Sequence, residues 1–533
     1  MFPFGTQSWN IETISLSGKK VTAMNYYASR LMIRGDNHYL HLFCNLFQQF
    51  IVDMYAKIEQ QRLQFLRFNQ KLLRSHLLSG LQDAVRLEDG STDLSVVGRR
   101  IILPSSFVGS ARYMQQLYQD AISIVRRFGK PDFFITFTCN PKWPEIRREL
   151  LHSKQTVADR PDLYARVFKQ KLSVFMEDLI SNQILGKVIA HIHVIEFQKR
   201  GLPHAHILLI VSAADKPRTV EDIDKIVSAK IPDPVNQRLA YETVTSSMMH
   251  GPCGDLFPNA PCMKDGKCSK SFPHKFNQST TIEEGSGFPK YHRPQNGRVI
   301  YRNGIPLGNA WVVPHNIDRC IKYNAHINVE ICNTVKSVKY IYKYVYKGHD
   351  RASVEMRTAR QEGQTENAAA VQVEGDDEIQ QFLDARYVSS SEACWRIFHF
   401  SLHQEYPSHQ RLQIHLEGQQ NVCFYEASNR LLVDIVENAE AKDTTLTAWF
   451  KYNRINESAR QYLYGEFPEH FFVWRNNVWH PRKNPNGSTI GRIYAVSPKT
   501  QEKYYLRMLL QHVRGALSYQ DLRTVNQHVY PTF

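Results

Sequence analysis

The sequence predicts an α+β fold, because patterns typical of helices and of strands both occur along the chain. Residues 43–87 carry apolar side chains at helical spacing. Residues 188–198 and 204–211 are instead rich in β-branched residues and are separated by a short polar link that contains glycine and proline. We therefore expect a helical N-terminal region, an antiparallel sheet with helices, an inserted cysteine-rich module and a mixed C-terminal region.

The length of 533 residues suggests about three folded units. We expect a helical region over residues 1–95, a central domain over 96–350 with a Cys/His module inserted at 245–280, a polar linker over 351–378 and a mixed C-terminal domain over 379–533. The linker is expected because residues 357–377 are polar and contain an alanine triplet and acidic residues.

The first helical pattern combines an apolar stripe with a basic extension. The apolar side chains are Phe47, Phe50, Ile51, Met54, Tyr55 and Ile58, and the basic ones that follow are Arg62, Arg67, Lys71 and Arg74. Two interpretations remain open: a helical subdomain packed on the central domain, or direct contact of the basic face with DNA. Residues 114–127 repeat the helical pattern, and 132–138 are expected to form a buried strand.

The composition fits a nucleic-acid partner without specifying it. The formal net charge is +15, the isoelectric point is about 9.2 and aromatic residues make up 11%, which suits phosphate contacts and base stacking. No apolar run approaches the ~18 residues that a membrane-spanning helix needs, so we expect no membrane partner. Nine cysteines without a secretory signal favour reduced thiols in the cytosol or nucleus.

The two β-rich segments predict a hairpin whose period of two brings metal-binding side chains together. The residues that share a face are Ile192, Val194, Glu196 and Gln198 on the first strand and His204, His206, Leu208 and Ile210 on the second. If the turn is centred near Gly201, Gln198 lies opposite His204 and Glu196 lies opposite His206. Two imidazoles and an oxygen donor can then converge on one divalent cation.

A second histidine pair serves as an internal comparison. His191 and His193 have the same spacing as His204 and His206 but fall on the opposite face of their strand from Glu196. We therefore interpret His191 and His193 as packing or surface residues.

The segment 337–348 carries four tyrosines, and its period is ambiguous. Alternation would suit a strand, whereas in a helix Tyr340, Tyr344 and Lys347 line up on one face and Gly348 ends it. We favour the helix. A phenol with a pKa of ~10 is about 0.1% ionised at neutral pH, so a tyrosine nucleophile there needs a cation that polarises its phosphate target.

A third group of chemistry-bearing residues lies between the histidines and the tyrosines. His250, Cys253, Cys262 and Cys268 lie in a glycine- and proline-rich loop with three lysines. Three thiols and an imidazole are enough for a tetrahedral structural Zn²⁺ site, and a loop with few hydrophobic residues needs such a cross-link. The spacing is not that of a standard zinc finger. His274 competes with His250 as the fourth ligand, and reduced cysteines or disulfides are the alternatives.

Several long strings of the sequence resemble the replication-initiator half of Helitron transposases, a group of rolling-circle enzymes within the wider family of His-hydrophobic-His (HUH) nucleases. The matching strings are residues 47–59, 103–109, 134–146, 196–208, 339–350 and 383–389, and the likeness runs from about residue 21 to the end of the chain. The resemblance implies a palm-like sheet, a metal pair at His204 and His206, and two nucleophiles at Tyr340 and Tyr344. It also implies a covalent 5′-phosphotyrosine intermediate and a free 3′-hydroxyl.

The sequence departs from full Helitron proteins in one respect. A helicase needs a glycine-rich phosphate loop ending in Gly-Lys-Ser/Thr, and the nearest string, residues 265–268, lacks both the glycine spacing and the hydroxyl. We therefore expect no ATPase on this chain, and a helicase would have to be supplied elsewhere.

The expected function is metal-dependent cleavage and strand transfer of single-stranded DNA at transposon ends. It would use Mg²⁺ or Mn²⁺ at Glu196, Gln198, His204 and His206, with Tyr340, Tyr344 and Lys347 as the catalytic residues. The resemblance implies a nuclear location. The alternative is a domesticated, truncated or decayed copy that only binds DNA.

Overall fold

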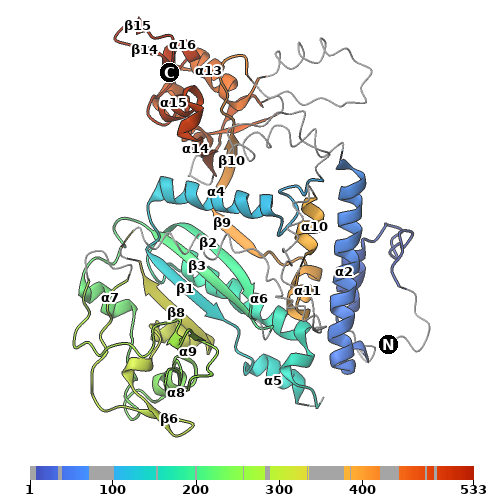
Figure 1. Cartoon of the computed structure of the whole chain (residues 1–533), viewed down its shortest axis with the longest axis vertical. Coiled ribbons are helices and arrows are strands. Elements are labelled where there is room, and N and C mark those ends of the chain that lie inside the picture. Colours follow the sequence, from blue (N-terminus) through green and yellow to red (C-terminus); the bar gives the residue numbers. More distant parts are fainter. Residues whose placement is uncertain are drawn as a thin grey trace, which may run out of the picture. The chain divides into compact units, whose positions relative to one another are not determined.

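The structure described here is a computed structural model of the chain, and Figure 1 shows the order of its helices and strands. It describes residues 8–33, 39–70, 101–151, 154–198, 201–255, 257–282, 288–332, 334, 377–384, 386–419, 443–474, 477–484 and 489–533. Helices and antiparallel strands both occur, so the α+β prediction is confirmed. Within these residues, no helix combines the length and the apolar character needed to span a bilayer.

The chain forms two compact units, each assembled from separate segments. Unit 1 comprises residues 1–59, 128–344 and 388–405, and unit 2 comprises 60–127, 345–387 and 406–533. The linear division into four consecutive regions stays a prediction, since the units draw on segments far apart in the sequence.

A five-stranded sheet forms the centre of unit 1. Its strand order is β8-β1-β3-β2-β9, and β1 pairs antiparallel with both β3 and β8, while β2 pairs antiparallel with β3. The strands are β1 (Phe133–Thr138), β2 (Val188–Phe197), β3 (Pro203–Val211), β8 (His326–Ile331) and β9 (His403–Tyr406). The predicted buried strand at 132–138 and the predicted hairpin at 188–211 are thus present, as β1 and as β2 with β3.

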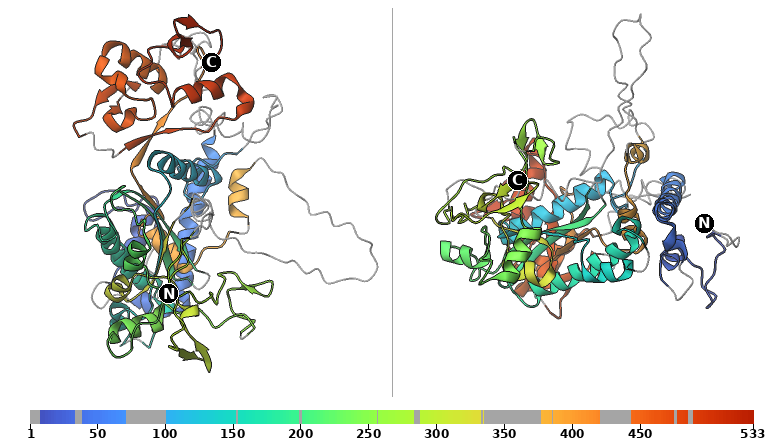
Figure 2. Two further views of the ribbon diagram at one scale, coloured as in Figure 1. Left: turned by 90° about the vertical axis from the view of Figure 1, so that its left-hand side faces the viewer. Right: turned by 90° about the horizontal axis from the view of Figure 1, so that it is seen from below.

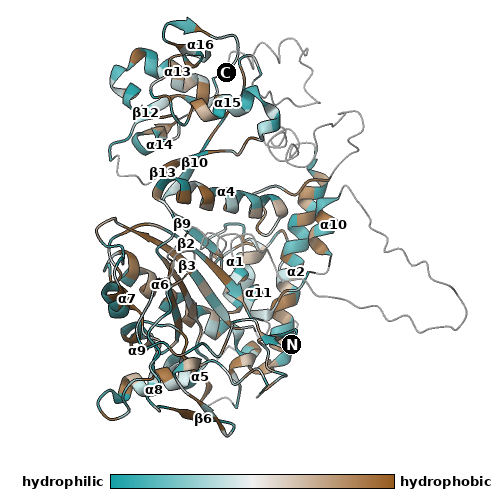
Figure 3. Cartoon of the chain, turned by 60° about the vertical axis from the view of Figure 1, so that its left-hand side comes forward, coloured by the Kyte–Doolittle hydropathy of each residue, from teal (hydrophilic) through white to brown (hydrophobic). Residues whose placement is uncertain are grey.

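The two faces of this sheet differ in chemistry because side chains alternate along each strand. One face is apolar, and Figure 3 shows the hydrophobic character of β3 in brown. Its buried side chains are Phe133, Ile135, Phe137, Ile195, Ala205, Ile207, Leu209, Ile327, Val329 and Ile331. The other face carries the histidines and carboxylates of the candidate site.

Helix α6 (Pro161–Ile180) covers the apolar face of the sheet. The ring of Phe137 stacks on Phe168 and Phe175 of this helix, with centroids 5.5 and 4.9 Å apart. Tyr323 adds an edge-on contact to Phe137 at 5.8 Å. These aromatic contacts pack α6 against the apolar face of the sheet, opposite the face that carries His204 and His206. Figure 2 shows the sheet and α6 from two further directions.

Further helices and two short hairpins complete unit 1. The first helical prediction corresponds to α2 (Asn45–Phe68), whose early part contributes Phe47, Ile51 and Tyr55 to the unit 1 core; residues 71–87 of that prediction lie outside the described residues. The other elements are α1 (Ala23–Arg30), α5 (Pro144–Leu150), α7 (Val220–Ile226), α8 (Arg238–Ser247), α9 (Ile317–Tyr323), α11 (Ser390–Ile397), β4 (Met263–Lys264), β5 (Lys267–Cys268), β6 (Ile300–Arg302) and β7 (Ile305–Leu307), with 3₁₀ turns at Tyr39–Phe43, Val157–Asp159 and Asn309–Trp311.

Unit 2 has its own core, built around Trp449, Tyr464 and Phe467. Helix α4 (Ala111–Phe128) matches the predicted helix at 114–127. The other elements are α10 (Glu378–Leu383), α13 (Thr445–Ile455), α14 (Phe467–His470), α15 (Glu502–Leu509), α16 (Tyr519–Leu522), β10 (Ser408–Leu412), β11 (Phe471–Val473), β12 (Trp479–Pro481), β13 (Thr489–Ile493), β14 (Thr524–Val525) and β15 (His528–Val529), with 3₁₀ turns at Glu457–Gln461 and Pro498–Thr500. Strands β10 and β13 pair in parallel.

The predicted linker lies outside the described residues except for its last two. Asp377 caps the N-terminus of α10 and pairs with Arg67 at 2.9 Å, while Glu378 pairs with Arg112 at 2.7 Å. These two acidic residues are therefore part of the folded unit 2, since each is ion-paired within it.

Candidate metal centre

The β2–β3 hairpin forms the candidate site, with a register that differs from the predicted one. Glu196 pairs with His204, and Val194 pairs with His206. The prediction that Gln198 faces His204 is wrong by two residues, because the pairing is centred one residue earlier in the chain than Gly201. The link between the strands is closed by the N–H of Gln198, which donates to the carbonyl of Leu202 at 3.0 Å. The shift is an even number, so the predicted faces are kept.

Glu196, His204 and His206 converge on one point of the polar face. The Nε2 atoms of His204 and His206 lie 3.6 and 3.8 Å from Oε2 of Glu196. Their potential ligand atoms all lie within 4.8 Å of one another. The three side chains are between 9 and 15% exposed, so they are shielded yet reachable. Two imidazoles and a carboxylate in this arrangement can hold one metal ion.

Neighbouring side chains fix the orientation of His206. Its Nδ1 lies 3.1 Å from Oγ1 of Thr136, and its ring stacks on that of Phe134, with centroids 5.6 Å apart and planes 11° apart. When Nδ1 donates its hydrogen to Thr136, Nε2 carries the lone pair that faces Glu196. Such a bond on the far ring nitrogen is the usual way in which proteins orient a metal-binding histidine.

The donor set fits a cation bound through Nε2 of His204, the ring nitrogen that faces Glu196. The Nδ1 atom of the same ring is buried and has no hydrogen-bond partner within the described part of the chain. An ion bound at Nε2 would not satisfy Nδ1, so the fit rests on the two imidazoles and the carboxylate.

The structure reveals polar residues on the same face that the sequence analysis missed. Strand β8 presents His326, Asn328 and Glu330 on it, and Thr138 of β1 pairs with both His204 and His326. The string 326–331 alternates polar and β-branched residues, and this period of two was the signal that could have identified the strand.

His326 and Glu330 have altered proton affinities in this environment. Burial lowers the pKa of His326, and the nearby His204 lowers it further. Its Nδ1 donates to the carbonyl of Ser247 at 2.8 Å, so the ring is fixed next to the candidate centre. Burial raises the pKa of Glu330 to about 7, against the opposing effects of Tyr291 and Arg293. Glu330 is thus a carboxyl group that exchanges its proton near neutral pH.

The other histidine pair has the expected packing role. His191 and His193 lie on the face opposite to Glu196, and burial lowers their pKa values to about 4 and about 3. Glu405 of β9 influences His191, so a carboxylate does approach this pair, from a strand that the sequence analysis did not consider. Neither histidine belongs to a potential metal group among the described residues.

The other predicted site residues have two different outcomes. Gln198 is exposed, lies just beyond the end of β2, and pairs with neither His204 nor His206. Tyr340, Tyr344 and Lys347 lie outside the described residues, so their predicted roles stay predictions.

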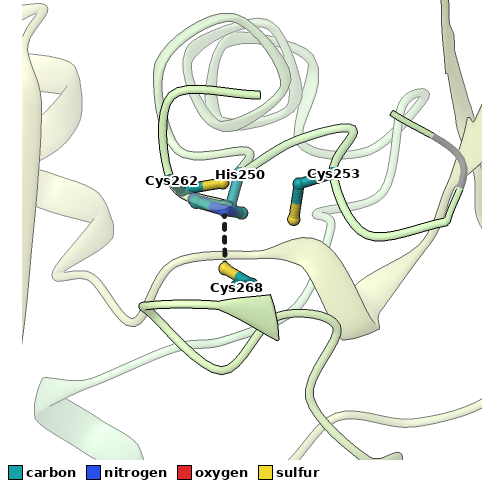
Figure 4. Close-up of side chains that lie close together, drawn as sticks. All are labelled: His250, Cys253, Cys262 and Cys268. Atoms are coloured by element: carbon teal, nitrogen blue, oxygen red, sulfur yellow. Dashed lines mark hydrogen bonds between the residues drawn. The ribbon is translucent and has the colours of Figure 1, made fainter. Parts of the chain in front are cut away.

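The predicted cysteine module contains a second potential metal group. Figure 4 shows the side chains of His250, Cys253, Cys262 and Cys268 close together. Their ligand atoms all lie within 4.8 Å of one another. His274 is not part of this group; burial lowers the pKa of its imidazole to about 4. The eight cysteines in the described part of the chain are free thiols, so they form no disulfide.

The comparison with protein families identifies part of the chain. Residues 26–209 match the family described as the Helitron helicase-like domain at the N-terminus. The chain carries a Helitron helicase-like N-terminal domain. The matched segment begins in α1, ends in β3, and includes Glu196, His204 and His206. A Helitron-related domain links the chain to transposons. No curated protein matches this chain.

Proposed function

We propose that this Helitron-related chain is a metal-dependent single-stranded DNA endonuclease and strand transferase of rolling-circle transposition. The observation that carries the proposal is the convergence of Glu196, His204 and His206 on the polar face of the sheet, with ligand atoms within 4.8 Å. The resemblance to two-tyrosine HUH nucleases supports the same reaction, since it assigns the metal pair to His204 and His206. The net charge of +15 suits a DNA substrate.

The metal-binding role follows from the chemistry of the three side chains. Imidazole nitrogens bind transition-metal ions such as Mn²⁺ through their lone pairs. The carboxylate adds the negatively charged oxygen that Mg²⁺ and Mn²⁺ prefer. When bound there, Mg²⁺ or Mn²⁺ supplies a positive charge that polarises the scissile phosphate. Thr136 and Phe134 hold His206 in place, so the site is arranged before the substrate arrives.

The chemical step assigned to the tyrosines is a transesterification. The phenol oxygen of Tyr340 or Tyr344 forms a bond to phosphorus, and the bond between phosphorus and the 3′ oxygen breaks. The phenol proton is lost to a base, and the departing 3′ oxygen takes up a proton to become a free hydroxyl. The 5′ end stays attached as a phosphotyrosine, which a 3′-hydroxyl of another strand can attack to complete transfer.

Lys347 and Glu330 are assigned supporting roles. The ammonium of Lys347 would lower the pKa of a neighbouring phenol and offset phosphate charge. Glu330, whose pKa is raised to about 7, carries an exchangeable proton on the same face as His206. Two tyrosines would allow cleavage of one strand and transfer of another to be coupled. A helicase would be supplied by another protein or domain, and the protein would act in the nucleus.

Cleavage of a labelled single strand in Mn²⁺ tests the proposal. His204→Ala and His206→Ala should abolish cleavage yet leave DNA affinity within a few fold, because lysine and arginine contacts to phosphates dominate binding. His191→Asn is the matched control and should keep most activity, since His191 lies on the opposite face. Equal loss in all three variants would contradict the assignment of the metal centre. Binding without any cleavage by the unmodified protein would favour the DNA-binding remnant.

A further inference from the structure

Three thiols and one imidazole meet in a part of unit 1 that has little regular secondary structure. Sγ of Cys268 lies 3.4 Å from Nε2 of His250, and the thiols of Cys253 and Cys262 lie on the other sides of the same small space (Figure 4). Cys253 is only 2% exposed. Three cysteine sulfurs and one histidine nitrogen are a usual ligand set of structural zinc sites.

The local backbone brings two of the thiols together. Strands β4 and β5 form a hairpin in which Met263 pairs with Cys268. Its two turn residues, Asp265 and Gly266, have φ angles of 49° and 73°, as a two-residue Asp-Gly turn requires. The carbonyl of Cys262 accepts the N–H of Ser269 at 2.8 Å. The Asp-Gly turn closes this short hairpin, and the hairpin brings Cys262 close to Cys268 in space.

The other two ligands are held by contacts to Trp311. The N–H of His250 donates to the carbonyl of Trp311 at 2.8 Å, and the imidazole stacks on Phe272 with centroids 4.2 Å apart. Gly251 has a φ of +91°, and a Cβ atom there would lie 2.7 Å from the Trp311 ring. Only glycine fits at position 251, so the chain can turn tightly between His250 and Cys253.

Backbone groups also favour a thiolate at Cys268. Its sulfur accepts the N–H of Lys270 at 3.4 Å.

We propose that His250, Cys253, Cys262 and Cys268 hold one structural Zn²⁺, and that this ion braces the candidate metal centre through the segment Ser247–Met248. Uncharged thiols in the same positions would gain only weak S–H contacts in a region with few apolar side chains. The ion replaces those contacts with four strong bonds and joins three stretches of chain that are otherwise linked by loops.

The bracing follows from contacts that start three residues before the first ligand. The carbonyl of Ser247 accepts the ring Nδ1–H of His326, and Sδ of Met248 accepts the backbone N–H of Ile327 at 3.4 Å. The carbonyl of Met248 accepts the N–H of Val313 at 2.8 Å. His326 lies opposite Thr138 of β1, which pairs on its other side with His204. Anchoring His250 therefore fixes strand β8, which one strand separates from His204.

The metal content of the purified protein tests the zinc site. Protein purified without added metal should release about one equivalent of Zn²⁺ on treatment with a thiol-specific mercurial. Cys262→Ser and Cys268→Ser should lose this zinc, whereas Cys44→Ser, a partly buried thiol outside the group, and His204→Ala should retain it. Because a variant can fail to fold, the unmodified protein is also loaded with Co²⁺, which should give a sulfur-to-cobalt charge-transfer band. No zinc in fresh protein and no such band, or zinc retained by Cys268→Ser, would overturn the site.

Hydrogen exchange tests the bracing. In Cys268→Ser, peptides covering 245–250 and 326–331 should exchange faster than in Cys44→Ser, while peptides from α6 should not change. Faster exchange confined to 251–275 would show that zinc stabilises only its own loop and would overturn this part of the proposal. Neither experiment involves DNA cleavage, so failure of the nuclease proposal would leave the zinc site standing.

Discussion

Glu196 lies directly opposite His204 in the β2–β3 hairpin, and Oε2 of the carboxylate is 3.6 Å from Nε2 of the imidazole. Because His206 follows two residues after His204, all three side chains project from the same face of the sheet. The register of one hairpin thus assembles the metal group, and a slip of one residue would separate its members.

This register separates the roles of two neighbouring oxygen donors. Glu196→Gln should weaken Mn²⁺ binding by at least about tenfold, since the loss of a direct ligand should cost no less than the loss of a group that orients one. Gln198→Ala should change the Mn²⁺ affinity by less than about twofold, because Gln198 is exposed and pairs with neither histidine. Titration calorimetry with Mn²⁺ measures both constants. The opposite order of effects would support the register predicted from sequence and contradict the structure.

The sequence predicted the local parts of this arrangement but not its long-range parts. Alternating β-branched residues located β2 and β3 and their polar face. The register was wrong because it depends on how the link around Gly201 closes, which alternation does not specify. His326 was missed although its strand alternates, because the pairing of β8 with β1 joins residues almost 190 positions apart. Contacts at such separation depend on the whole fold, as does the assembly of each unit from three separate segments.

The raised pKa of the half-buried Glu330 carboxyl group predicts a specific dependence of stability on pH. Its pKa is raised from 4.5 to about 7 in the folded chain. As pH rises, the unfolded chain therefore loses this proton first, and the contribution of Glu330 to stability falls between about pH 4.5 and pH 7 and is constant above. An amide mimics the protonated acid, so Glu330→Gln should gain up to about 3 kcal/mol relative to the unmodified protein across this range.

Urea denaturation of both proteins at several pH values checks this prediction. The free energies of unfolding of Glu330→Gln and of the unmodified protein could instead change in parallel between pH 4.5 and pH 7.5. That result would contradict the prediction, because it would show that Glu330 has an ordinary proton affinity in the folded chain. Comparing the two proteins cancels the contributions of the buried histidines, whose lowered pKa values act in the opposite direction.

The core of unit 2 includes a position where only glycine fits. A Cβ atom on Gly491 would collide with the carbonyl oxygen of Gly465 and would lie 2.6 Å from Leu412. Gly491→Ala should therefore lower the free energy of unfolding by about 1–3 kcal/mol, the usual cost of overpacking. Gly465→Ala is the matched control, since its Cβ would make only an ordinary contact at 3.6 Å with Ile493. Guanidinium denaturation of both variants measures the difference, and equal midpoints would contradict the close packing of β10 and β13.

The most direct test of the central claim is the trapping of a covalent protein–DNA adduct. The protein is incubated with labelled single-stranded DNA and Mn²⁺ and separated by denaturing electrophoresis, and the labelled band is mapped by mass spectrometry. The account predicts a 5′-phosphate on Tyr340 or Tyr344, partial adduct formation in each single Tyr→Phe variant and none in the double variant. The adduct should also disappear in His204→Ala. No adduct on any single strand tested, or an adduct on Tyr342 or Tyr346, would contradict the account.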